Sequence, residues 1–530
     1  MQSQTIPAIV VALQDDLNLP YEIKEITSIE KFPDDRFFLN FTKQVAYYHQ
    51  VAPLLLIKRF RKFIEQKNEN ESSETIASHS NIDLIVNQLT EEQQNAYDQI
   101  LPQIIKPAYK ATILHGVTGS GKTEVYKKLI EACLKNNKSA ILLLPEVTLA
   151  AQFEAILSLA FPDKTILGFH SASSAKQKKQ LWQKLVNHQS CLIIGVHLPI
   201  LLPIANIGLI IVDEEHEVGY QEKKHPCLNS KELAIMRAHV YQIPIVLGSA
   251  TPSISSLHNL KRPEWQIIKL TKRFNGAFPK IKLVSIGKKQ SNPHFLISKE
   301  LITAIQSRLD KQEQIIIFLN RRGYSFFVQC AGCNFIFNCR QCAVSLTLHQ
   351  DETLRCHYCD FKQNMPISCS KCDGKKFIKK GVGTQQIVSV LAKLFPAARI
   401  ARADLDTTSK KNEWQKTVHK FTNKKLDIIV GTQTITKGYH FPGVTLVGVL
   451  WADINLHLPF FNAAEVALQQ ILQVAGRAGR QAQESEVIIQ TMLPHPIFNY
   501  LQEELYLQFY TNEIQNRTLT HYPPVVRLVE

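Results

Sequence analysis

Residues 110–131, KATILHGVTGSGKTEVYKKLIE, join an apolar strand to a helical run through a glycine-rich loop. The loop has the spacing G-x-x-x-x-G-K-T of a phosphate-binding loop and the strand–helix context that such a loop needs, so a chance glycine turn is the weaker interpretation. Its glycines let backbone N–H groups converge on phosphates at the N-terminus of the helix. We expect Lys122 to contact the β and γ phosphates of ATP and the Thr123 hydroxyl to bind Mg²⁺. The predicted nucleotide-binding residues of the loop are Gly116, Thr118, Gly119, Ser120, Gly121, Lys122 and Thr123.

Short runs of Val, Ile and Leu alternate with helical patterns on both sides of this loop. A first series comprises ATILHG, SAILLLP, CLIIGV, LIIVDEE and IPIVLGSA, and a second comprises QIIIFLN, ARIARADLD, LDIIVGTQ, VTLVGVLWAD and SEVIIQT. This alternation predicts an α/β fold with two parallel-sheet lobes covered by helices. Residues 192–212 are apolar enough for a membrane span, but their prolines and glycines, and the acids that follow, favour two buried strands joined by a loop.

Acidic residues follow one of these strands, at residues 210–216, IIVDEEH. Ligands of open α/β sheets bind at the carboxyl ends of the strands. Asp213 is expected to hold Mg²⁺, and Glu214 to orient or deprotonate the attacking water. Acids after a strand often form only a solvated turn, but together with the phosphate-binding loop they predict a hydrolytic site.

The second lobe carries QVAGRAGR at residues 473–480, with Arg477 and Arg480 three residues apart on one face of an expected helix. An arginine that reaches the γ-phosphate across the cleft stabilises the charge of the transition state and makes hydrolysis depend on lobe closure. The alternative is a basic pair on the surface.

Three further segments are weak when taken singly, since ordinary loop packing explains each of them equally well. They are GSATP at 248–252, FLNRRGY at 318–324, and GTQ at 431–433 followed by KGYHFP at 437–442. The ordered set resembles the superfamily 2 helicases, and DEEH with GVTGSGKTEVY, GSATP, FLNRRGY and QVAGRAGR resembles the PriA family of primosomal replication-restart helicases. The resemblance implies that the two lobes are RecA-like and that Gln93 reads the adenine. It also implies that Ser249 and Thr251 couple hydrolysis to DNA movement, with His216 between them.

Eight of the 11 cysteines form four Cys-x-x-Cys pairs between residues 330 and 372. In a reducing cytosol such pairs indicate zinc and not disulfides. The 13 residues between the second and third pairs suit a zinc ribbon better than the five between the first and second, which predicts nested sites. One zinc would take Cys339, Cys342, Cys356 and Cys359 and the other Cys330, Cys333, Cys369 and Cys372, as the resemblance also implies. The module also carries basic side chains that suit contact with DNA or a partner, namely Arg340, Lys371, Lys375 and Lys376. Its aromatic side chains suit either such contact or the filling of a small core; they are Phe335, Phe337, Tyr358 and Phe361.

The chain of 530 residues has 61 Lys and Arg against 46 Asp and Glu, a net charge of +15. This excess favours polyanionic partners, although a merely basic protein would show it too. The N-terminus has no basic region followed by an apolar stretch, so we expect a cytoplasmic, nucleoid-associated protein without membrane partners. The expected organisation is a partial 3′-end DNA-binding domain at 1–66, a linker at 67–85, the first lobe at 86–258, the second lobe at 259–326 and 381–495 around a zinc insert at 327–380, and the start of a truncated C-terminal region at 496–530.

The resemblance implies a 3′-5′ DNA helicase, dependent on ATP and Mg²⁺ and holding two Zn²⁺, that remodels stalled replication forks and promotes primosome assembly. Its partners would be forked and single-stranded DNA, single-strand-binding protein, PriB, DnaT and the replicative helicase. Residues 223–232, KKHPCLNSKE, replace the aromatic, arginine-rich loop with which the family senses DNA. Two alternatives therefore stay open: another superfamily 2 translocase, on RNA or duplex DNA, and a non-enzymatic zinc-dependent DNA adaptor with an uncoupled motor.

Overall fold

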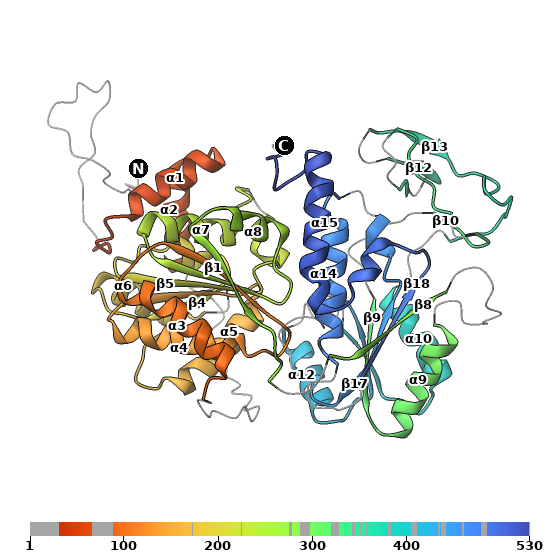
Figure 1. Ribbon diagram of the computed structural model, residues 1–530, viewed down its shortest axis with the longest axis horizontal. Helices are drawn as coiled ribbons and strands as arrows, with labels where there is room; N and C mark the ends of the chain where they lie inside the picture. The colour runs from red at the N-terminus through yellow and green to blue at the C-terminus, as the bar shows by residue number, and fades with distance from the viewer. Residues whose placement is uncertain are drawn as a thin grey trace, which may run out of the picture.

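Two α/β lobes lie side by side, with helices α14 and α15 between them (Figure 1). The computed structural model describes residues 31–65, 88–171, 173–223, 225–274, 278–286, 297–319, 328–333, 335–341, 345–349, 351–356, 359–378, 383–403, 411–432, 435, 441–457, 460–478 and 485–528. The linker expected at 67–85 lies outside these residues. None of the described helices has the length and apolar character needed to cross a bilayer.

The first lobe is built on a seven-stranded parallel sheet in the order β3-β4-β2-β5-β6-β1-β7. Its strands are β1 (Lys110–Gly116), β2 (Ser139–Leu143), β3 (Ile166–Gly168), β4 (Leu192–Gly195), β5 (Ile207–Asp213), β6 (Pro244–Ser249) and β7 (Trp265–Leu270). The covering helices are α3 (Glu91–Ile105), α4 (Lys122–Lys135), α5 (Val147–Ala160), α6 (Ala175–Val186), α7 (Ser230–Tyr241) and α8 (Ile254–His258). Alternate strand residues enter two different core clusters, as Ile113 and Leu114 do, because both faces of the sheet are covered.

The structure decides two predictions about the first lobe, the nature of the apolar stretch at 192–212 and the boundary at residue 258. The apolar stretch at 192–212 forms the buried strands β4 and β5, each paired with β2, so the two-strand interpretation is confirmed. The boundary at residue 258 is wrong, because β7 pairs with β1 and residues 259–270 therefore belong to the first lobe. This edge strand, WQIIKL, is only partly buried and so lacks the continuous apolar run that marked the central strands.

The second lobe has a six-stranded parallel sheet in the order β15-β16-β9-β17-β18-β8. Its strands are β8 (Lys280–Ser285), β9 (Gln314–Leu319), β15 (Ile400–Ala403), β16 (Ile428–Gly431), β17 (Val444–Leu450) and β18 (Glu486–Thr491). Its helices include α9 (Lys299–Asp310), α10 (Thr384–Leu394), α12 (Lys411–Thr422) and α14 (Ala463–Ala475). The sequence did not predict β8, a largely exposed edge strand. The predicted fold class, two RecA-like lobes with a cysteine-rich insertion in the second, is confirmed.

The cysteine-rich insert lies between β9 and α10 and projects from the second lobe (Figure 1). It contains a two-stranded antiparallel sheet of β10 (Gln329–Cys330) and β14 (Phe377–Ile378), and a three-stranded one of β11 (Thr347–Leu348), β12 (Thr353–Arg355) and β13 (Lys362–Asn364). Phe337 is buried and its ring lies 5.3 Å from that of Phe335 and 5.6 Å from that of Phe377. Of the two roles left open for the insert's aromatics, core filling is therefore the role of Phe337.

The described part of the N-terminal region packs on the first lobe as two helices, α1 (Phe38–His49) and α2 (Pro53–Glu65), and shares its core. Just before α1, the buried Asp35 carboxylate accepts hydrogen bonds from the Tyr241 hydroxyl at 2.5 Å and the Ile204 N–H at 2.8 Å. The predicted partial DNA-binding domain at 1–66 therefore has its last helices fixed to the first lobe, while its DNA-binding role stays a prediction.

The C-terminal region, with η5 (Pro496–Tyr500), η6 (Glu503–Leu505) and α15 (Tyr506–Leu519), packs between the lobes beside α14. The Tyr506 hydroxyl donates to the Pro252 carbonyl of the first lobe at 2.8 Å, and Arg517 pairs with Glu465 of α14 at 2.9 Å. The C-terminal region thus connects the two lobes.

Candidate active site

The phosphate-binding loop links β1 to α4 in a conformation that requires glycine. Gly119 and Gly121 have φ values of +82° and +79°, in the left-handed region that favours glycine. The Lys122 ammonium donates to the Gly116 carbonyl at 2.8 Å, inside the loop. The loop therefore has the backbone curvature and the cation needed to hold the phosphates of ATP.

Gln93 supports this loop from α3. Its side-chain amide donates to the Ser120 carbonyl at 2.9 Å and accepts from the Thr90 N–H at 3.0 Å. A Cβ at Gly121 would lie 2.3 Å from the Gln93 Nε2 atom, so a larger residue there would displace this side chain. Gln93 thus lies at the nucleotide site, and its predicted contact with adenine stays a prediction.

Asp213 ends β5 beside the first turns of α4, where Oδ1 of its carboxylate accepts a hydrogen bond from the Tyr126 hydroxyl at 2.9 Å. Burial raises the pKa of Asp213 to about 6, with the neighbouring Glu214 adding to the rise and Lys122 opposing it. A divalent cation would offset that cost of burying the carboxylate, so the site fits the expected Mg²⁺.

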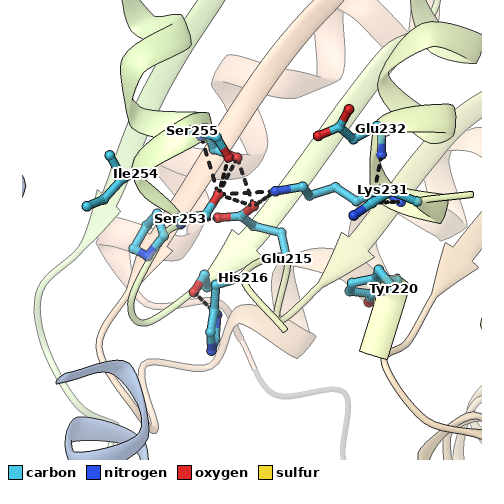
Figure 2. A network of polar contacts seen from close by, with 12 residues as sticks. Glu215, His216, Tyr220, Lys231, Glu232, Ser253, Ile254 and Ser255 are labelled. Carbon is cyan, nitrogen blue, oxygen red and sulfur yellow. Dashed lines mark hydrogen bonds and ion pairs between the residues drawn. The ribbon is translucent and has the colours of Figure 1, made fainter. Parts of the chain in front are cut away.

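The three consecutive acids at the end of β5, Asp213, Glu214 and Glu215, have different partners. Glu214 has a left-handed backbone, φ 47°, and its Oε2 lies 3.7 Å from Nδ1 of His216. Glu215, fully buried, accepts hydrogen bonds from the Lys231 ammonium at 3.0 Å and the Ser253 N–H at 2.5 Å (Figure 2). Burial alone would raise the pKa of Glu215, but Lys231 and the other donors hold it below its usual value. Glu215 therefore joins β5 to α7 and α8, a structural contact, while the role of Glu214 toward the attacking water stays a prediction.

His216 connects the lobes. Nε2 of its ring lies 2.6 Å from the Gln473 amide nitrogen of α14, and its Nδ1 lies 2.7 Å from the Ser249 hydroxyl. Because an amide nitrogen only donates, Nε2 is the acceptor and Nδ1 carries the proton. The Ser249 hydroxyl also accepts from the Thr251 N–H at 2.9 Å. His216 thus lies between the second lobe and the Ser249–Thr251 segment, while the coupling role of these residues stays a prediction.

Arg477 enters the same region from the second lobe. It lies in the turn after α14, which ends at Ala475, so the predicted helical face is wrong for this residue; Arg480 lies outside the described residues. Arg477 is buried, which lowers its pKa, while the carboxylates of Glu214 and Glu217 oppose that change. The preceding Gly476 touches the phosphate-binding loop, since a Cβ there would lie 2.6 Å from the Thr118 hydroxyl. The structure therefore brings Arg477 to the ATP site, and contact with the γ-phosphate stays a prediction.

We call the contact surface between the first lobe and α14–α15, around His216 and Thr118, the interlobe seam. Sequence analysis gave no role to three of its residues, Arg273, Gln473 and Glu503, nor to Tyr126, which bonds to Asp213 inside the first lobe. Gln473 belongs to a quoted motif, so its spacing before Arg477 was a usable signal. Tyr126 likewise ends the quoted stretch GVTGSGKTEVY, whereas Arg273 and Glu503 had no such signal, because they pair over 230 positions of sequence.

The described cysteines of the insert fall into two groups. Within each group, the sulfur atoms lie within 4.8 Å of one another. One group contains Cys330, Cys333, Cys369 and Cys372, and the other Cys339, Cys356 and Cys359. Sulfur–sulfur distances of 3.5 to 3.6 Å were found within them. Tetrahedral zinc with bonds near 2.3 Å separates its sulfur ligands by about 3.8 Å, so both groups fit zinc. The grouping agrees with the nested prediction, whose remaining ligand, Cys342, lies outside the described residues.

Three family models match this chain: a DEAD/DEAH box helicase over residues 90–260, a helicase conserved C-terminal domain over 372–482, and the PriA DNA helicase Cys-rich region over 339–363. The replication restart protein PriA of Bacillus subtilis is 39% identical, with 82% of this chain and 54% of that protein covered. PriA of Rickettsia typhi is 34% identical, with 83% of this chain and 68% of that protein covered. The chain belongs to the PriA family.

The similarity to PriA covers most of this chain but leaves part of each relative unmatched. This chain spans 54% of the length of the B. subtilis PriA and 59% of that from Chlamydia pneumoniae, which is 37% identical over 83% of this chain. Among solved structures, RecG bound to a three-way DNA junction aligns with a TM-score of 0.47 and 16% identity, covering 92% of this chain and 52% of that one.

Proposed function

We propose that this PriA-family chain is an ATP-dependent 3′-5′ DNA helicase that remodels stalled replication forks and promotes primosome assembly, so that the replicative helicase is reloaded. One observation carries the motor part of the proposal: Gln473 of the second lobe meets His216, directly after the acids of the first. Hydrolysis that needs residues from both lobes depends on the seam being closed, and a cycle of closing and opening is the motion of a translocating motor.

In the proposed site, the loop at 116–123 holds the phosphates, and Thr123 and Asp213 hold Mg²⁺. The metal would neutralise charge on the β and γ phosphates. Glu214 would orient the attacking water, and Arg477 with Arg480 would stabilise the charge that develops on the γ-phosphate. Gln93 would read the adenine, and Ser249, Thr251 and His216 would report nucleotide state to the DNA-binding face.

We further propose that the insert holds two Zn²⁺, one per cysteine group. The expected partners are forked and single-stranded DNA, single-strand-binding protein, PriB, DnaT and the replicative helicase, with the protein associated with the nucleoid. The net charge of +15 and membership of a replication restart family support contact with DNA.

The test of the enzyme is Lys122→Ala. We expect ATP hydrolysis stimulated by forked DNA, and unwinding of the fork, to fall by roughly 100-fold or more because a cation on the transferred phosphate is lost. DNA binding should remain. Lys128→Ala, on the same helix α4 and paired with Glu131 at 3.5 Å, is the matched control.

Two outcomes would contradict the proposal. If the unmodified chain with Mg²⁺ and forked DNA hydrolyses no ATP, it is not an enzyme of this kind, and the zinc-dependent adaptor is favoured. If RNA stimulates hydrolysis as strongly as a fork does, another superfamily 2 translocase is favoured over a restart helicase.

A further inference from the structure

A carboxylate from the C-terminal region lies on the phosphate-binding loop. Glu503, in η6, accepts a hydrogen bond from the Thr118 N–H at 3.0 Å. These two residues are 385 positions apart in the sequence. The Glu503 side chain is only 6% exposed, so this is a buried contact and not a transient one at the surface.

A second partner fixes the same carboxylate. Oε2 of Glu503 pairs with the Arg273 guanidinium at 3.0 Å, and the Arg273 side chain is 7% exposed. Arg273 follows β7, in a segment bound to the loop by a hydrogen bond from the Phe274 N–H to the Gly119 carbonyl at 3.0 Å. Glu503 is thus held on one side by the loop and on the other by a cation attached to the loop.

This arrangement is the one by which proteins bind a phosphate oxygen. Backbone N–H groups of a glycine-rich loop before a helix, with a nearby arginine, recognise anions of this kind. A single N–H donates one strong hydrogen bond, so a carboxylate on Thr118 excludes a phosphate oxygen from that donor. The two anions would also repel each other if they shared the loop.

We propose that Glu503 is a residue of the ATP site, which occupies the place of a phosphate oxygen in the nucleotide-free protein and is displaced when ATP binds. The proposal rests on the proposed function, since it assumes that the loop binds ATP. Its chemistry is an exchange of anions: the carboxylate leaves the Thr118 N–H, and a phosphate oxygen of ATP replaces it.

The displacement reaches the helix between the lobes. Glu503 lies three residues before Tyr506, the first residue of α15, whose hydroxyl bonds to the Pro252 carbonyl. Releasing Glu503 removes one of the contacts that hold the start of α15 against the first lobe. Occupation of the ATP site is thereby linked to the position of the C-terminal region.

The test measures nucleotide binding without hydrolysis or DNA. Affinity of the full chain for the non-hydrolysable analogue AMP-PNP, with Mg²⁺, is compared between the unmodified protein, Glu503→Gln and Glu504→Gln. We expect Glu503→Gln to tighten binding by about tenfold, the effect of removing one charge-assisted hydrogen bond from the competing state. Glu504→Gln removes the same charge at the adjacent exposed residue, and we expect no change in its affinity.

A second measurement needs no variant. Amide hydrogen exchange at residues 503–510 of the unmodified chain should become faster when AMP-PNP binds. Unchanged or weaker binding by Glu503→Gln, or exchange that is slowed or unaffected by AMP-PNP, would overturn the displacement. Intact AMP-PNP binding without any DNA-stimulated hydrolysis would overturn only the proposed function. An unmodified chain that does not bind AMP-PNP would overturn both.

Discussion

The interlobe seam and the cysteine-rich insert are held together in opposite ways. In the insert, the paired sulfur atoms belong to residues 20 to 42 positions apart. Across the seam, Gln473 meets His216 over 257 positions, and Glu503 meets Thr118 over 385. The seam depends on many neutral or singly charged hydrogen bonds, each of which contributes about 1 kcal/mol. The insert depends on few ligands and, we propose, on a metal.

The difference suits the seam to opening and the insert to staying folded. A surface held by modest, separate hydrogen bonds opens when a few of them are exchanged, which suits a site that must admit and release nucleotide. The insert has a small apolar core, and two of its members, Cys339 and Cys356, belong to a predicted metal site. A module with so little apolar burial requires the metal for its fold.

The largest expected effect is therefore metal removal. Apparent binding free energies of structural zinc are about 10–16 kcal/mol, so a strong chelator should unfold the insert while AMP-PNP still binds at the loop. Hydrogen exchange over residues 328–378, with zinc content measured by atomic absorption, tests this. Cys356→Ser should lower the zinc content by about half if each cysteine group holds one ion.

The matched control is Cys227→Ser, which changes an exposed cysteine outside both groups and should leave the zinc content as it is. If reduced, unmodified protein contains no zinc, the insert is not a metal module and the contrast with the seam fails.

The next effect concerns the buried ion pair behind the seam. Lys231→Met would leave the Glu215 carboxylate charged and buried without its cation. Removing one partner of such a pair costs about 3–5 kcal/mol, so urea unfolding of the first lobe should shift accordingly. The zinc content of the insert should not change.

Glu215→Gln together with Lys231→Met is the control, since removing both charges should recover part of the lost stability. If Lys231→Met alone is as stable as the unmodified chain, the first lobe does not depend on this pair.

The sequence predicted the strands and metal-ligand groups that are defined by patterns among neighbouring residues. The central strands β1, β2, β4, β5 and β6 were found because strands buried on both faces are continuous apolar runs. The cysteine grouping was found because ligand spacing is constrained within one short module. The edge strands β7 and β8 were missed, since partial exposure removes the apolar run.

The seam could not be predicted in the same way. Arg477 was expected on a helical face because a period of 3.6 residues was extended past Ala475, where α14 ends. Nothing in the sequence near Glu503 indicates that it meets Thr118, because that contact depends on how two lobes pack. The predicted phosphate-binding residues were accessible to sequence analysis, whereas Glu503, which we propose competes with a phosphate oxygen there, was not.

The smallest of the three effects tests the seam most directly. Gln473→Ala removes the amide that donates to Nε2 of His216, without touching the phosphate-binding loop. We expect AMP-PNP affinity to stay within about twofold and DNA-stimulated hydrolysis to fall by about tenfold, since the hydrogen bonds from Gln473 to His216 and to Oε1 of Glu217, at 3.3 Å, are lost from the closed seam. Gln470→Ala is the matched control: it lies on the same helix, is equally buried, and accepts from Asn455 at 3.4 Å within the second lobe. If both variants lose activity to the same extent, α14 matters only as a packed helix. If only Gln473→Ala does, the contact between the lobes carries the coupling, because Gln473 bonds to His216 and Glu217 of the first lobe whereas Gln470 bonds to Asn455 of the second.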